Sequence, residues 1–271
     1  MIIDGSSCQT IEKGLCNILE IDIETLHDTI GLFEMKSTKG QCFYSDIYKQ
    51  ECYKFIDENK RKQLEEIYVY HLGRYIAIPN ELKPLPKLLT SKNSLTEYLK
   101  SRDVFFTYED RKIWLVYKGK RVNAVEIYDE QRLENHCRLA KRFGYFNIAD
   151  FCVNGFAFAA DIEKEGNHYY SSLQIGPELL QDLDDFLETD MCNDFNKISH
   201  YYLFTIKASL DDIIFDGKED VRNHDEKQKY YLYKCMLFLN EAYERSSSRD
   251  NPIIRFRDDK TVKIEEYVQF D

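Results

Sequence analysis

Apolar side chains in the first part of the chain recur at steps of three and four positions. The first such series is Ile11, Leu15, Ile18 and Leu19. This spacing places the apolar side chains on one face of a helix, whose start Ser6 or Ser7 can cap. The same pattern predicts helices over residues 23–35 and 44–66. We expect residues 1–65 to form a helical subdomain that packs on, or caps, the rest of the chain.

From residue 67 onward, β-branched and aromatic residues gather in short runs that are typical of strands. The first run is Ile67-Tyr68-Val69-Tyr70-His71-Leu72. Further strand patterns cover residues 104–122 (a hairpin), 150–160, 201–208, 253–256 and 262–270. Ser246-Ser247-Ser248 marks the loop that precedes the last two of them.

Helical patterns are interspersed among these strands. They cover residues 94–101, 130–143, 177–187 and 227–244. Ser94 followed by Glu97 predicts a capping box, and Pro177 suits the first turn of its helix. Strands and helices do not follow a strict βαβ order. The sequence therefore predicts a mixed α+β domain over residues 66–271.

The net charge of −11, from 48 acidic and 37 basic side chains, narrows the range of partners. Non-specific binding of nucleic acid depends on many Lys and Arg residues that displace counterions. An acidic chain is unsuited to this, although a local basic patch remains compatible with a nucleic-acid target. The chain has no apolar run near the ~20 residues that cross a bilayer and no secretory signal pattern. We expect no membrane association and a cytoplasmic location, with a secreted effector not excluded.

The eight cysteines show no C-x-x-C pair and no zinc-finger spacing. We interpret them as free thiols in a reducing compartment, while Cys8, Cys16, Cys42 and Cys52 could pair in a secreted protein. His136-Cys137 with Cys152 matches no metal-ligand pattern, so no metal site is predicted. No Gly-x-Gly occurs among the eleven glycines, which excludes the Rossmann fingerprint and the P-loop.

Three separate segments carry candidate chemistry. The first, Tyr70-His71-Leu72-Gly73-Arg74, ends the first strand after the helical region. The second runs from Asn154-Gly155-Phe156-Ala157-Phe158 through Asp161 to Tyr169-Tyr170-Ser171-Ser172. The third is the terminal Glu265-Glu266-Tyr267-Val268-Gln269-Phe270-Asp271. Taken singly, each is an ordinary strand with a histidine, aromatic rings or solvated glutamates.

Together and in this order, the segments resemble the diphtheria-toxin-like, poly(ADP-ribose) polymerase-type ADP-ribosyltransferases of the H-Y-E class. The resemblance covers about residues 67–271 and implies an α+β fold with a mixed, mainly antiparallel split β-sheet core. It implies that His71 orients a ribose hydroxyl of NAD and that the Leu72 backbone and Arg74 contribute to the cofactor site. It selects Glu266 as the catalytic carboxylate, because Glu266 precedes Tyr267-Val268 as the catalytic Glu of the family precedes a Tyr and a β-branched residue.

The middle segment departs from the family pattern. The first tyrosine of the family falls on Ala157 counted from Gly155, or on Phe158 counted back from Tyr169, and either residue lacks the phenolic hydroxyl. Tyr169 or Tyr170 would stack on nicotinamide, a contact worth roughly 0.5–1.5 kcal/mol beyond area burial. Ser171 or Ser172 would reach the carboxamide.

The resemblance implies an enzyme that consumes NAD as a substrate and transfers ADP-ribose to a macromolecule, either a protein or a nucleic acid. A toxin or anti-phage defence effector, with a neutralising antitoxin or inhibitor as a partner, is the expected setting. A catalytically silent binding module on the same fold is the alternative. A nuclease or another toxin-type enzyme that uses scattered His and Asp residues is a third.

Overall fold

The computed structural model describes residues 1–39, 44–124, 133–145, 150–160, 162–163, 168–244 and 250–270. Helices and strands are mixed, and the strand pairs are mainly antiparallel. This confirms the mixed α+β class. The chain divides into two compact units. Unit 1 comprises Met1–Tyr70, Gly155–Asn167 and Ile206–Arg255, and unit 2 comprises His71–Asn154, His168–Thr205 and Phe256–Asp271.

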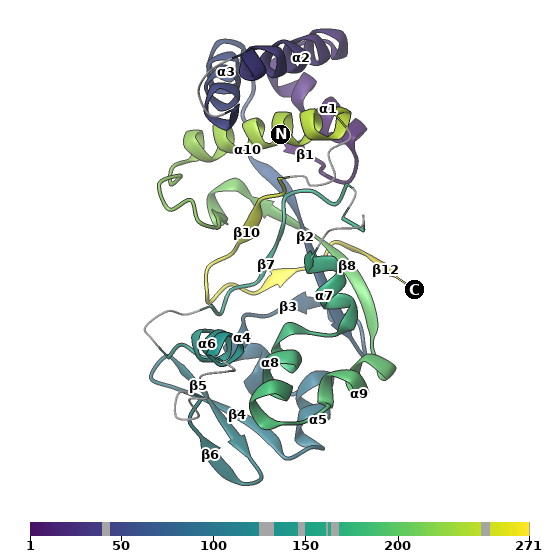
Figure 1. Cartoon of the computed structure of the whole chain (residues 1–271), viewed down its shortest axis with the longest axis vertical. Helices are drawn as coiled ribbons and strands as arrows, with labels where there is room; N and C mark the ends of the chain where they lie inside the picture. The colour runs from purple at the N-terminus through teal and green to yellow at the C-terminus, as the bar shows by residue number, and fades with distance from the viewer. Residues whose placement is uncertain are drawn as a thin grey trace. The chain divides into compact units, whose positions relative to one another are not determined.

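Unit 1 contains four long helices, of which three come from the N-terminal part of the chain. They are α1 (Cys8–Leu19), α2 (Ile23–Lys39), α3 (Tyr44–Asn59) and α10 (His224–Tyr243). The Ser7 side chain accepts a hydrogen bond from the Thr10 amide, which confirms Ser7 as the N-cap of α1. Within unit 1, α10 lies between the α1–α3 helices and the strands (Figure 1).

Helix α10 is buried on nearly all sides, which agrees with its position between two layers. Its aromatic residues Tyr231 and Phe238 are buried in the core of unit 1. Helices α1, α2 and α3 all pack against α10. The structure therefore groups residues 1–65 with later segments of the chain in one compact unit.

The strands of unit 1 follow the order β9-β10-β7-β2-β8, with β1 parallel to β2. Three of them (β2, β7 and β8) continue into unit 2. The elements are β1 (Ile2–Ile3), β2 (Glu66–Tyr75), β7 (Asn154–Phe156), β8 (His200–Ser209), the 3-10 helix η2 (Leu210–Asp212), β9 (Ile214–Phe215) and β10 (Ile253–Arg255). The strand predicted over residues 150–160 is thus much shorter.

Unit 2 contains an antiparallel meander, where the sequence predicts a hairpin. Its strands are β4 (Val104–Glu109), β5 (Lys112–Tyr117) and β6 (Lys120–Val122). Asp110 and Arg111 form the two-residue turn between β4 and β5, and both have positive φ, 52° and 59°. Such turns match the right-handed twist of the flanking strands.

Six helices of unit 2 are described. They are α4 (Leu85–Thr90), α5 (Ser94–Lys100), α6 (Leu133–Arg142), α7 (His168–Ile175), α8 (Glu178–Leu187) and α9 (Met191–Ile198). Residues 130–132 of the helix predicted over 130–143, and the loop at Ser246-Ser247-Ser248, lie outside the described residues.

The predicted capping box at the start of α5 is wrong by one residue. Asn93 is the N-cap: its side chain accepts from the Thr96 amide, and the Thr96 hydroxyl accepts from the Asn93 amide. Asn93 has an extended backbone, whereas Ser94 is already helical, so Ser94 cannot be the cap.

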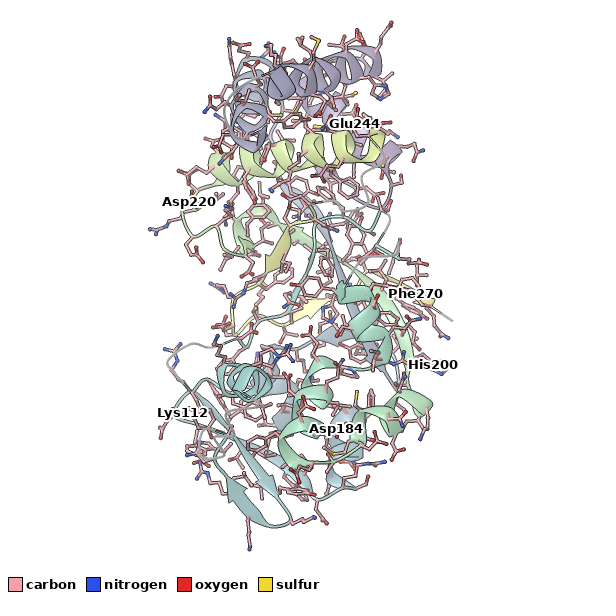
Figure 2. The ribbon with its side chains drawn as sticks, in the orientation of Figure 1. Lys112, Asp184, His200, Asp220, Glu244 and Phe270 are labelled. Carbon is pink, nitrogen blue, oxygen red and sulfur yellow. The ribbon has the colours of Figure 1, made fainter. Side chains whose placement is uncertain are left out.

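The segment predicted as one strand over residues 262–270 forms two strands in unit 2. Strand β11 (Val262–Lys263) pairs with β3 (Glu81–Leu82), and β12 (Glu266–Phe270) pairs antiparallel with β8. Figure 2 labels His200 and Phe270, which lie near the paired ends of β8 and β12. The order β12-β8-β2 brings the terminal strand near the strand that carries His71.

Candidate functional site

Within unit 2, strands β12, β8 and β2 carry a row of three rings on one face. Tyr267 lies directly opposite Phe204 in the β12–β8 register, and their ring centroids are 6.4 Å apart. The His71 imidazole is stacked on the other side of Phe204, also at 6.4 Å between centroids. We call this the His71 face.

The His71 imidazole has a defined protonation state. Its Nδ1 lies 2.6 Å from the Asn154 carbonyl oxygen, which can only accept, so Nδ1 donates the hydrogen bond. Burial lowers the pKa of His71, although the bond to Asn154 raises it. The ring is therefore neutral near pH 7, and Nε2 presents a lone pair.

Because Gly73 has no side chain, the space next to the Nε2 atom of His71 is free on that side. A Cβ at position 73 would lie 3.3 Å from His71 Nε2 and 2.7 Å from Tyr75 Cε2. Any larger residue would crowd both rings. Among the residues that the structure describes, no hydrogen-bond partner occupies Nε2. His71 can thus accept a hydrogen bond from a ligand hydroxyl.

The rings of the His71 face differ in exposure. Phe204 and Tyr202 are buried, and they pack together with centroids 5.5 Å apart. Tyr267 is 51% exposed and meets Tyr202 edge-on, at 6.0 Å and 83°. An exposed tyrosine ring on a rigid, aromatic base is suited to stacking against a flat ligand.

Arg74 lies on the opposite face of the same strands and is bonded to protein atoms. Its guanidinium donates to the carbonyl oxygens of Gln174, Asn196 and Ser199, at 3.2, 3.1 and 2.9 Å, and to Ser199 Oγ at 3.2 Å. These carbonyls belong to the C-terminal ends of α7 and α9, where helices leave acceptors unsatisfied. Arg74 therefore joins two helix ends to β2.

Tyr170 belongs to the same opposite face, which we call the Arg74 face. Its ring packs on Tyr201 and Phe270, with centroids 5.3 Å apart in each case. The Arg74 guanidinium lies 5.9 Å from the Tyr201 ring centroid. Tyr169, the neighbouring candidate for nicotinamide stacking, is an exposed residue of α7.

Glu266 is exposed and begins β12 opposite Thr205. Because side chains alternate along a strand, Glu266 shares a face with Phe270, and Tyr267 points the other way. Glu266 therefore lies on the Arg74 face, and the structure does not bring its carboxylate to the imidazole of His71. Glu265 precedes the strand and donates its amide to the Thr205 carbonyl, so alternation does not fix its direction.

The remaining expected cofactor contacts are buried. Leu72 is a core residue on the Arg74 face. Gly155 in unit 1 allows a close strand approach, since a Cβ there would lie 2.7 Å from the Tyr70 carbonyl oxygen. Phe158 in unit 1 is fully buried against Tyr231 and Phe238. Within their own units, these residues contribute to packing.

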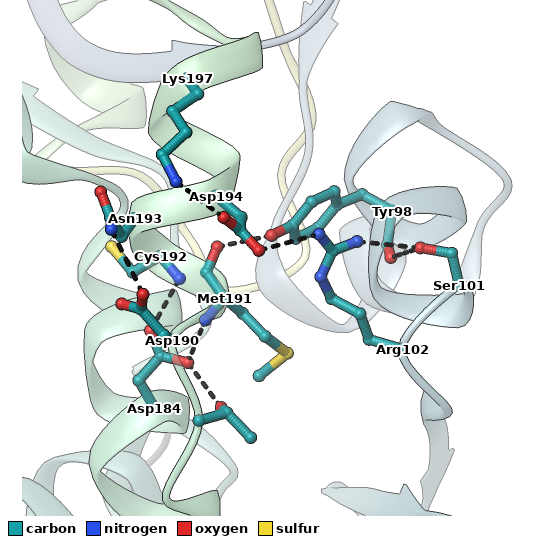
Figure 3. A network of polar contacts seen from close by, with 11 residues as sticks. Tyr98, Ser101, Arg102, Asp184, Asp190, Met191, Cys192, Asn193, Asp194 and Lys197 are labelled. Atoms are coloured by element: carbon teal, nitrogen blue, oxygen red, sulfur yellow. Dashed lines mark hydrogen bonds and ion pairs between the residues drawn. The ribbon is translucent and has the colours of Figure 1, made fainter.

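Unit 2 also contains a polar network that the sequence did not predict, and its task is structural. The Asp184 carboxylate accepts from the Thr189 hydroxyl and from the amides of Met191 and Cys192, at 2.6–2.7 Å (Figure 3). It caps the start of α9, whose first amides have no helical partner. The Tyr98 hydroxyl donates to the Met191 carbonyl and joins α5 to the network. In the sequence, the only sign of this network is Asp184 ahead of the Thr189-Asp190 pair.

No cluster of three metal-ligating side chains occurs in the described part of the chain. The side chains of His136 and Cys137 lie outside that part, as does Cys42. Cys8, Cys16 and Cys52, which could pair in a secreted protein, are free thiols. The alternative disulfides among the described cysteines are thus not formed.

None of the described helices has the length and apolar character needed to cross a membrane. Neither a protein-family model nor a curated protein nor a solved structure matches the chain.

Proposed function

We propose that the chain is an ADP-ribosyltransferase that consumes NAD and modifies a macromolecule, either a protein or a nucleic acid. The observation that carries the proposal is the neutral His71 imidazole, whose Nε2 is left open beside Gly73. A ribose hydroxyl can donate to this nitrogen. The exposed Tyr267 ring on the same face supplies a surface for a flat ring of the dinucleotide.

The reaction needs a carboxylate near the sugar. Cleavage of the nicotinamide–ribose bond builds positive charge on the ribose, which a nearby carboxylate stabilises. Glu266 is the first candidate from the sequence resemblance. Glu265 is the second, because its direction is not set by the alternation of β12.

Matched variants distinguish the two carboxylates. We expect one of Glu266→Gln and Glu265→Gln to bind NAD normally and to lose roughly 100- to 1000-fold in transfer rate. The other variant should remain near the parent rate. The measurements are NAD titration and release of labelled nicotinamide. Full transfer activity in both variants would exclude a catalytic carboxylate at the start of β12.

The position of Glu266 favours a second candidate function, an NAD-binding module without transfer activity. Glu266 lies on the face opposite His71, so the ligand face lacks the carboxylate on which the resemblance relies. Isothermal titration with NAD, followed by the nicotinamide-release assay, separates the two functions. Binding without release would identify the module.

The acceptor is to be identified directly. Labelled NAD and the protein are incubated with a cell extract, and the product is divided for protease and nuclease treatment. Label that is released by protease alone identifies a protein acceptor, and label released by nuclease alone identifies RNA or DNA. A cellular inhibitor or antitoxin would appear as an extract fraction that stops the reaction.

A further inference from the structure

Strand β12 forms one edge of the strand order in unit 2. One side of the strand pairs with β8 over five residues, from Glu266 to Phe270. The amide and carbonyl groups on its other side have no strand partner in the described part of the chain. An unpaired edge of this kind is a ready template for another extended chain.

Several other strand edges in the described part of the chain are short or charged, and one belongs to a strand that contacts helices. Strand β9 has two residues, and β6 has three, including Lys120 and Arg121. Strand β4 packs against helices α4 and α5. Proteins commonly use these devices to prevent pairing at an edge.

The described residues of strand β12 show none of these features that prevent pairing. It is five residues long and contains no Pro, Lys or Arg. Tyr267 is 51% exposed and Val268 is 57% exposed, although both favour strand pairing. The only charge within the strand is Glu266, and the exposed Glu265 precedes it. The edge is therefore open, partly apolar and acidic at its start.

We propose that this edge binds an extended, basic segment of a partner protein as an additional strand. The backbone groups of β12 supply the hydrogen bonds, as in other cases of strand addition. A Lys or Arg of the segment pairs with Glu266, and a β-branched or aromatic residue packs beside Val268. Glu266 and Val268 share a strand face, so the two recognition positions are separated by one residue.

The acidic start of the strand selects the occupant. A basic segment gains opposite-charge pairs across from Glu265 and Glu266, which a like-charged segment would lose. Binding of the segment depends only on the strand edge. Its role as an acceptor or inhibitor beside a catalytic carboxylate rests on the proposed function.

The test uses the full chain and a labelled synthetic peptide, Thr-Val-Thr-Lys-Thr-Arg, blocked at both ends. Two control peptides carry Glu in place of Lys and Arg, or N-methyl groups at alternate amides. We expect fluorescence anisotropy to show binding of the basic peptide and at least about tenfold weaker binding of each control. NMR should locate the affected amides in β12. Equal binding of the N-methylated peptide would overturn strand addition.

Substitutions on the protein locate the edge. Val268→Lys and Tyr267→Lys add a charge to the exposed edge and should each weaken peptide binding at least about tenfold. Val268→Thr keeps a β-branched residue, and Ile175→Lys changes a 63% exposed residue on α7; both should stay within about twofold of the parent.

Two further results would overturn the proposal. The first is undiminished peptide binding by both Lys variants. The second is a dimer that Val268→Lys dissociates while the parent binds no peptide, which would assign the edge to a second copy of the chain. All measurements are made without NAD, so their failure leaves the proposed transfer reaction untouched.

Discussion

On the Arg74 face of strands β2, β8 and β12, the guanidinium of Arg74 donates its hydrogen bonds to the protein itself. On the His71 face, the Nε2 atom of His71 is an acceptor that is left open. Arg74 donates to three backbone carbonyls, and His71 uses only Nδ1. Both residues come from one short segment that strand alternation divides between two faces. Residues that are close in sequence therefore have separate tasks, one in stability and one in ligand contact.

The largest expected effect is on the Arg74 face. Arg74→Ala removes bonds from a charged donor to carbonyls at two helix ends, and we expect the free energy of unfolding to fall by about 3 kcal/mol. Chemical denaturation measures this change. Arg74→Lys keeps the charge without the planar set of donors and should lose roughly half as much.

Arg74 is also a candidate cofactor contact, so the same variants test whether its task is only structural. If Arg74 has only a structural task, the folded fraction of Arg74→Lys binds NAD with unchanged affinity. A large loss of affinity at unchanged stability would assign Arg74 to the ligand instead.

A smaller effect on stability is expected on the His71 face. In Gly73→Ala the new methyl group meets Tyr75 Cε2 at 2.7 Å and crowds His71 Nε2. We expect a loss of about 2 kcal/mol in unfolding free energy and weaker NAD binding. Gly31→Ala, where a Cβ meets nothing within 4 Å, is the control and should not destabilise the protein. Unchanged NAD affinity in Gly73→Ala would show that Nε2 is not used.

The smallest effect is a dependence of stability on pH. Burial lowers the pKa of His71 in the folded protein, so the unfolded chain binds the proton more readily. This contribution to stability is fully present above the unfolded pKa of about 6.5 and is lost as pH falls below it. Denaturation curves from pH 8 to pH 5 should show a larger loss of stability in the parent than in His71→Gln, because the other titrating groups are the same in both proteins. Parallel curves for the two proteins would contradict the assigned protonation state.

Periodic segments of the fold were predictable from the sequence. The spacing of Ile11, Leu15 and Ile18 gives α1, and the strand pattern over residues 201–208 matches β8 within a residue at each end. Two capping patterns overlap before α5, and the sequence alone does not tell which residue leaves the helical backbone. Short strands such as β3 and β9 carry too few residues to show a period.

For the candidate site, the sequence predicted only which neighbouring residues of one strand lie on opposite faces. Alternation correctly separates neighbouring residues between faces, but the tasks of the faces depend on distant segments. Arg74 meets Gln174 and Asn196, which are 100 and 122 positions away in the sequence. The carbonyl that orients His71 comes from Asn154, 83 positions away. No local pattern encodes these contacts.

The turn between β4 and β5 offers a practical benefit for all these experiments. Asp110 and Arg111 both hold a backbone conformation that ordinary side chains disfavour. Asn-Gly is the pair that such a turn prefers, so the double replacement Asp110→Asn and Arg111→Gly should raise the melting temperature. A thermally reinforced parent of this kind would keep damaging variants folded long enough to be assayed.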